Sequence, residues 1–123
     1  MIIVLIIQYL LGMYVNMFAA APEDPAFKTE GVFPKIVFGL HAFVGLGLLT
    51  GSIATLVLGL KSEKAAVKKT SFFAFGAIVL SFLAGVSTVA LKNTPSQIAS
   101  YVMSIGFLAS LIAYGKLFFL LKR

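Results

Sequence analysis

The sequence contains no cysteine, a single histidine and few charged residues. Without cysteine the chain can form no disulfide, thiolate metal site or cysteine nucleophile. Charged residues are 11% of the 123 residues, whereas an ordinary soluble domain has roughly 25%. The acidic residues are Glu23, Asp24, Glu30 and Glu63, and none lies inside a long apolar run. The composition therefore argues against a soluble domain and against a carboxylate proton relay within the apolar runs.

Hydrophobic residues make up 60% of the chain, and the mean hydropathy is +1.05. They gather in four runs at residues 2–21, 34–60, 66–91 and 95–121. A helix of about 20 apolar residues matches the hydrocarbon core of a bilayer, and backbone groups in lipid must be hydrogen-bonded internally. Because the later linkers are short, neighbouring helices are expected to be antiparallel. The sequence predicts an all-α fold, a single four-transmembrane-helix up-down bundle over residues 1–123.

The first run has one feature of a removable signal peptide. The segment FAAAPED at residues 18–24 resembles a small-residue cleavage site that follows an apolar region. However, a signal peptide has a positively charged segment before its apolar region, and no lysine or arginine precedes the apolar region here. We therefore expect the first run to be retained as a helix.

Lysine and arginine indicate how the chain is oriented. One side of the predicted bundle carries Lys61, Lys64, Lys68, Lys69, Lys116, Lys122 and Arg123. The other side carries Lys28, Lys35 and Lys92, together with three acidic residues. Since loops rich in lysine and arginine remain in the cytoplasm, we predict a multi-pass protein of the cell membrane with both termini cytoplasmic.

Each run carries a stripe of small and polar residues that recurs every three or four positions. In the second run the stripe is His41, Gly45, Leu48, Ser52, Thr55 and Gly59. Small residues let helix backbones approach in lipid, and polar residues turn toward protein, so these stripes should face the bundle interior. At about 1.5 Å per residue, His41 then shares an outer layer with four polar residues and two methionines. These are Asn16, Thr88, Ser100, Ser104, Met13 and Met103.

A histidine inside a membrane span is a functional-site hypothesis by default. Haem iron often takes an axial histidine, sometimes with methionine opposite. His41 could therefore bind haem b with Met103, Met13 or a second chain's His41, or serve a quinone-linked electron-transfer site. A neutral His41 bonded to Asn16, Thr88 or a serine would need no cofactor, and a proton-linked role is a third alternative. The packing role is the favoured interpretation.

Two short segments resemble a known group of proteins. They are QYLLGMYVN at residues 8–16 and LHAFVG at residues 40–45. With these segments the chain is similar, over its whole length, to small four-helix prokaryotic membrane proteins of unassigned function. The resemblance implies the four-helix architecture, and it implies no activity and no site residue.

The leading functional hypothesis is an accessory or structural subunit of a larger membrane complex, redox complexes included. A lone histidine without an acidic partner lacks the constellation that catalysis needs, so no enzyme activity is expected. The expected partners are the lipid bilayer and other membrane subunits or further copies of the chain. Nucleic acid is not expected, because the lysines flank apolar runs. A small oligomeric transporter or channel is a further alternative, although no ring of charge would set its selectivity.

Overall fold

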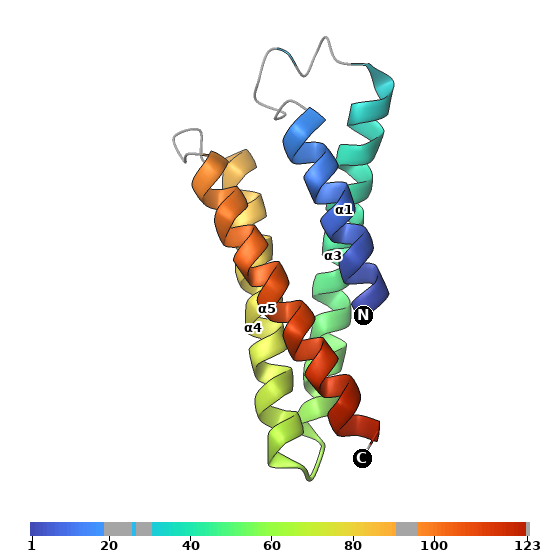
Figure 1. The fold of residues 1–123 in the computed structure, drawn as a ribbon, viewed down its shortest axis with the longest axis vertical. Coiled ribbons are helices and arrows are strands. Elements are labelled where there is room, and N and C mark those ends of the chain that lie inside the picture. Colours follow the sequence, from blue (N-terminus) through green and yellow to red (C-terminus); the bar gives the residue numbers. More distant parts are fainter. Residues whose placement is uncertain (19–25, 27–30, 91–95, 123) are drawn as a thin grey trace.

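The computed structural model describes residues 1–18, 26, 31–90 and 96–122, and the side chains of residues 88–90, 96 and 97 are outside the description. The described residues form α1 (Ile2–Phe18), α3 (Val32–Leu60), α4 (Ala65–Ala90) and α5 (Ser96–Lys122), as Figure 1 shows. No strand occurs among them. The predicted all-α class with four helices is thus confirmed.

The helix bounds differ only slightly from those predicted. α3 begins two residues before Pro34, which therefore lies in the first turn, where a missing N–H breaks no intrahelical bond. α4 and α5 each begin within one residue of the predicted positions. The predicted end of the first helix, at residues 19–21, lies outside the described residues.

Three of the four helices are long and apolar enough to cross a membrane. They are α3, α4 and α5, with 29, 26 and 27 residues. α1 has 17 residues and would be ~26 Å long, a little less than the ~30 Å hydrocarbon core of a bilayer. α1 packs against α3, which is 12 residues longer.

The helices run up and down in alternation, and α3 packs against both α1 and α4 (Figure 1). Away from the turn between α3 and α4 they separate into two pairs, α1 with α3 and α4 with α5. At one end, here called the turn end, residues 61–64 join α3 to α4 and α5 finishes close by. At the opposite end, here called the open end, the two pairs diverge. The Nζ atom of Lys64 donates to the carbonyl of Leu120 at 3.4 Å and ties the turn to the last turn of α5.

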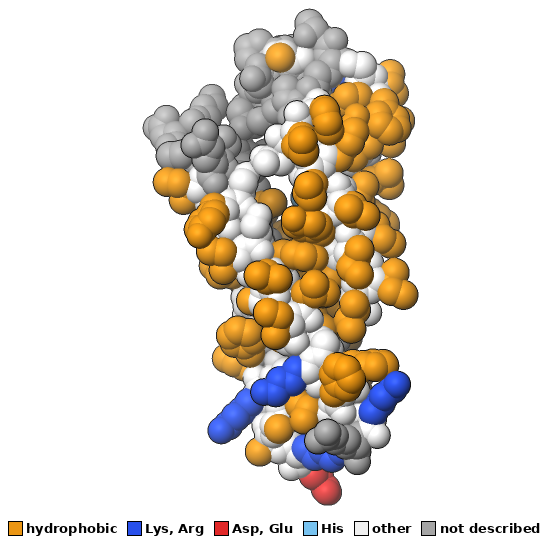
Figure 2. Space-filling view, viewed as in Figure 1, with side chains coloured by type: hydrophobic (Ala, Val, Ile, Leu, Met, Phe, Trp, Pro, Cys, Tyr) orange, Lys and Arg blue, Asp and Glu red, His pale blue; other side chains and the backbone are white. Residues whose placement is uncertain are grey.

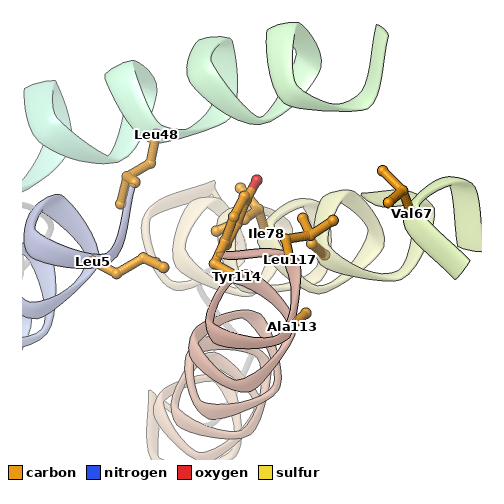
Figure 3. Close-up of a cluster of buried hydrophobic side chains, with 8 residues drawn as sticks. Leu5, Leu48, Val67, Ile78, Ala113, Tyr114 and Leu117 are labelled. Atoms are coloured by element: carbon orange, nitrogen blue, oxygen red, sulfur yellow. The ribbon is translucent and has the colours of Figure 1, made fainter. Parts of the chain in front are cut away.

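The hydrophobic core lies nearer the turn end. Figure 3 shows Tyr114 extending from α5 into the middle of the cluster, with its hydroxyl pointing toward α3. Only 5% of the Tyr114 surface is exposed. The buried cluster consists of Leu5, Leu48, Val67, Ala74, Ile78, Ala113, Tyr114 and Leu117. All four helices contribute to it, so the described helices meet in one core near the turn end.

Glycines let α4 approach both of its neighbours closely. A Cβ atom on Gly59 of α3 would collide with the Ser71 side chain of α4. A Cβ atom on Gly106 of α5 would collide with Oγ of Ser81 and would lie 3.0 Å from the carbonyl oxygen of Ala77. The Ser81 hydroxyl also donates to the carbonyl of Met103 at 3.2 Å. Small residues and one interhelical hydrogen bond therefore hold α4 against α5, as expected of helices in lipid.

The outer surface of the helices is mostly apolar. Figure 2 shows hydrophobic side chains over most of the visible face, with lysine side chains gathered near the turn end. Phenylalanines such as Phe43, Phe72 and Phe119 are each more than 60% exposed. A soluble monomer rarely exposes such a continuous apolar surface, so the long helices suit a lipid environment.

The contact at Gly106 predicts a stability difference between two glycine substitutions in α5. Gly106→Ala should destabilise the fold by about 1–2 kcal/mol, because a carbonyl oxygen cannot move aside as a flexible side chain can. Gly115→Ala is the matched control: no atom lies within 4 Å of its Cβ position, so it should stabilise by up to about 1 kcal/mol through helix propensity. Thermal unfolding in detergent, followed by circular dichroism, measures both. Equal effects would contradict the close α4–α5 approach.

Candidate functional site

His41 lies on α3 and packs against Gly12 of α1. Its Cε1 atom is 2.9 Å from the position that a Cβ atom would take on Gly12, and its Nδ1 atom is 3.5 Å from that position. The imidazole therefore occupies the space that any larger residue at position 12 would need. The side chain is half-buried, and its Nδ1 atom is fully covered.

A second contact of the same kind lies one helical turn away. Nε2 of Gln8 on α1 is 3.0 Å from the Cβ position of Gly45 on α3. Each helix thus places a long polar side chain on the other helix's glycine. The common pattern is a polar residue followed four positions later by glycine, at Gln8–Gly12 and at His41–Gly45. Because α1 and α3 are antiparallel, the two patterns become reciprocal.

The reciprocal contacts continue along the α1–α3 interface in a regular antiparallel register. Leu5 and Leu48 belong to the same buried cluster and extend from the two helices toward it (Figure 3). Further along, the sulfur of Met1 is 3.1 Å from the Cβ position of Gly51. Residues on α1 and α3 advance in steps of three or four in opposite directions, which is the spacing of left-handed helix packing. His41 is thereby held in a defined place relative to α1.

The imidazole and the amide contain unsatisfied polar atoms. Nδ1 of His41 and Oε1 of Gln8 are buried and have no hydrogen-bond partner. The imidazole also lies within reach of the Gln8 backbone. Gly12 lies one turn after Gln8 on α1, and because it has no side chain it leaves the Gln8 backbone accessible to the imidazole. These two buried atoms lie on facing helices and can still form hydrogen bonds. A water molecule, or a hydroxyl or carbonyl group of a ligand, could supply the partner.

The structure brings together part of the polar layer predicted around His41. Oγ of Ser100 on α5 donates to Oδ1 of Asn16 on α1 at 3.1 Å, which is an interhelical hydrogen bond between described residues of the open end. Ser104 instead donates to the carbonyl of Ser100 on its own helix at 2.9 Å. The side chain of Thr88 lies outside the described residues. His41 itself has Gln8 and Gly12 as its neighbours, and sequence reasoning did not connect these two residues with it.

The two methionines considered as haem ligands occupy different places. The sulfur of Met103 is 3.2 Å from the Cβ position of Gly85, so it lies in the α4–α5 interface, whereas the imidazole lies in the α1–α3 interface. Met13 follows Gly12 on α1 and is 44% exposed. Haem ligation by His41 with Met103, Met13 or a second chain's His41 stays a prediction.

The chemistry available at this site is that of neutral hydrogen-bonding groups. Within the described residues, no group of three or more histidine or acidic side chains could hold a metal ion. The Gln8 backbone, which lies within reach of the imidazole, is a neutral group that can orient the ring. The site therefore suits helix positioning or the binding of a small polar group.

The chain matches no protein-family model, no characterised protein and no solved structure. Its function is therefore inferred from its own residues.

The Gly12–His41 contact predicts a coupling between the two positions. Gly12→Leu alone should cost about 1–3 kcal/mol, because the new side chain displaces the imidazole. His41→Ala alone should cost about 1–2 kcal/mol, as for a lost polar contact between membrane helices. In the double variant the leucine fills the space that the imidazole leaves. The cost of the double variant should therefore be smaller than the sum of the two single costs by at least about 1 kcal/mol.

The control for this cycle is Gly39→Leu, since Gly39 is exposed and nothing lies within 4 Å of its Cβ position. It should leave stability within about 0.5 kcal/mol of the parent. Additive costs would contradict the packing of His41 on Gly12. An absorption spectrum of the same samples separates packing from haem binding: we expect a colourless protein, and a Soret band abolished by His41→Ala would assign a haem to His41 instead.

Proposed function

We propose that the chain is a multi-pass protein of the cell membrane that acts as a non-catalytic accessory subunit of a larger membrane complex. The observation that carries the proposal is the exposure of polar residues at the open end, where Asn16 of α1 and Ser104 of α5 remain exposed. Inward-facing polar groups in a membrane protein require a protein partner. A helix from another subunit, placed between the diverging pairs, would supply one.

The energetics at Asn16 favour such a partner. Its side-chain oxygen accepts the Ser100 hydrogen bond, while an asparagine amide also carries two N–H donors. Moving an unpaired amide from water into an apolar medium costs roughly 2–7 kcal/mol. A partner helix that accepts from this amide would remove that cost. The apolar side chains of the core near the turn end are already buried and need no such partner.

The residue types present support a non-catalytic role. The one histidine packs against Gly12 of α1, and no carboxylate lies on the four helices. The polar atoms of Ser52 and Ser110 are occupied by carbonyls of their own helices, at 2.7 Å each. A hydroxyl bonded in this way adds little nucleophilic character, since no base is near it.

The charge distribution supports an orientation with the turn end in the cytoplasm. Lys61, Lys64, Lys68 and Lys69 lie in or next to the turn between α3 and α4, and Lys116 and Lys122 lie in the last turns of α5. This asymmetry favours four membrane passes with both termini cytoplasmic. α1, the shortest helix, would complete its passage alongside α3.

Cysteine labelling of intact cells tests the orientation, and the cysteine-free chain provides a clean background. Ala26→Cys should react with a membrane-impermeant maleimide in intact cells. Ser62→Cys should react only after the cells are permeabilised, because residue 62 lies at the turn end. The reverse pattern would overturn the orientation, and equal labelling of both sites in intact cells would argue against a membrane-spanning bundle.

Photo-crosslinking tests the accessory role. A photoreactive amino acid at Ser104 of the open end should form a crosslink to one other membrane protein, and that protein should co-purify in near-stoichiometric amount in mild detergent. The matched control is Ile112 of the same helix, which is 64% exposed and two turns closer to the turn end. It should crosslink to that protein at least several times less. Recovery of a lone monomer or homodimer under several gentle conditions would overturn the proposal.

A further inference from the structure

A groove with a volume of about 820 Å³ lies on α4 and α5, and Leu60 of α3 also lines it. Its lining combines small residues such as Gly76 and Ala109 with the large, exposed side chains of Phe72, Phe73 and Ile105. No atom lies within 4 Å of the Cβ position of Gly76, so the groove is open directly above that glycine.

Two lysines stand at one end of this apolar groove. Lys68 and Lys69 line it in the first turn of α4, next to the turn end, and both are exposed. Every other lining residue is apolar or glycine. The structure gives neither ammonium group an anionic partner among the described residues. The groove thus has an apolar lining that includes the carbon stems of Lys68 and Lys69, two exposed lysines next to the turn end.

We propose that this groove binds an anionic phospholipid, with one acyl chain along α4 and the phosphate at Lys68 and Lys69. The proposal rests on the membrane location proposed above but not on the accessory role. From Lys68 to Leu80 the groove covers 12 residues of helix, or ~18 Å. One leaflet is about half of the ~30 Å hydrocarbon core, so the groove has the depth of a single acyl chain plus the start of its headgroup.

Charge decides between a lipid and a second copy of the chain. Two copies in one membrane have the same orientation, so a symmetric contact through this groove would bring Lys68 and Lys69 of both chains to the same level. Like charges placed together at an interface repel and disfavour the contact. The described acidic residue nearest in sequence is Glu63, in the turn itself and outside the groove lining. An anionic headgroup meets both lysines without this repulsion.

Native mass spectrometry of the purified chain tests the proposal. Protein is exchanged into detergent with equal amounts of phosphatidylglycerol and phosphatidylcholine that carry the same acyl chains, and the retained lipids are counted. The wild-type chain should retain phosphatidylglycerol in roughly 25-fold preference, about fivefold for each of the two lysines. Lys68→Gln with Lys69→Gln should reduce that preference by on the order of fivefold for each lysine lost.

Matched variants separate the groove from general charge and from folding. Lys116→Gln with Lys122→Gln removes the same charge from the same end but outside the groove, and should keep the preference. Gly76→Leu fills the groove and should reduce retention of both lipids several-fold. Gly47→Leu, on an equally open glycine of α3, should not. Circular dichroism verifies that all variants remain helical.

Three outcomes would overturn the proposal: equal retention of the two lipids by the wild-type chain, equal losses in the two double-lysine variants, or a stable dimer that Gly76→Leu dissociates. The last would assign the groove to a second copy. Because no partner protein enters this measurement, its failure leaves the accessory role to be judged by crosslinking alone.

Discussion

Close contact at glycine determines how these helices lie against one another. In an apolar medium the hydrophobic effect between helices is absent, so association depends on dispersion contacts and interhelical hydrogen bonds. The chain meets this constraint repeatedly in one way: a side chain of one helix occupies the space beside a glycine of another. Such contacts occur at Gly12, Gly45, Gly51, Gly59, Gly85 and Gly106. They bring the backbones near enough for many weak contacts to add up.

Hydroxyl groups contribute to this arrangement mainly within their own helices. Ser52, Ser87 and Ser110 each donate to a carbonyl one turn back at 2.7 Å. A serine bonded in this way enters an apolar interface with its hydroxyl satisfied and needs nothing from its neighbour. Interhelical bonds are therefore concentrated at a few points, among them Ser81 to Met103 and Ser100 to Asn16. The first reinforces the tight α4–α5 pair, and the second provides α1 with one polar link to α5.

Much of the fold follows from sequence periodicity, because small and polar residues in lipid must face protein. The predicted inward stripe of the second run, from His41 to Gly59, has no exposed member in the structure. The predicted depth of Asn16 and Ser100 likewise agrees with their hydrogen bond. Depth alone could not identify the neighbours of His41, since several residues share one level and the rotation of each helix decides which of them meet.

The pairing of His41 with Gly12 was nonetheless encoded in the chain. Gln8–Gly12 and His41–Gly45 have the same spacing and the same residue order. In antiparallel helices such patterns align only when each long side chain faces the other's glycine. The divergence of the two helix pairs had no comparable sequence signal, because it depends on the summed packing of whole faces. Tyr114 lies on the inward-facing stripe of the fourth run, and the structure buries it in the centre of the core.

The placement of the core at one end also has a mechanical consequence. The buried cluster draws side chains from all four helices, whereas the described parts of the two pairs diverge at the other end. A rotation of one helix pair against the other would therefore be centred on the cluster, and it would displace the far helix ends more than the core. The spacing between the pairs at the open end would then change to fit a neighbouring helix without unpacking the core.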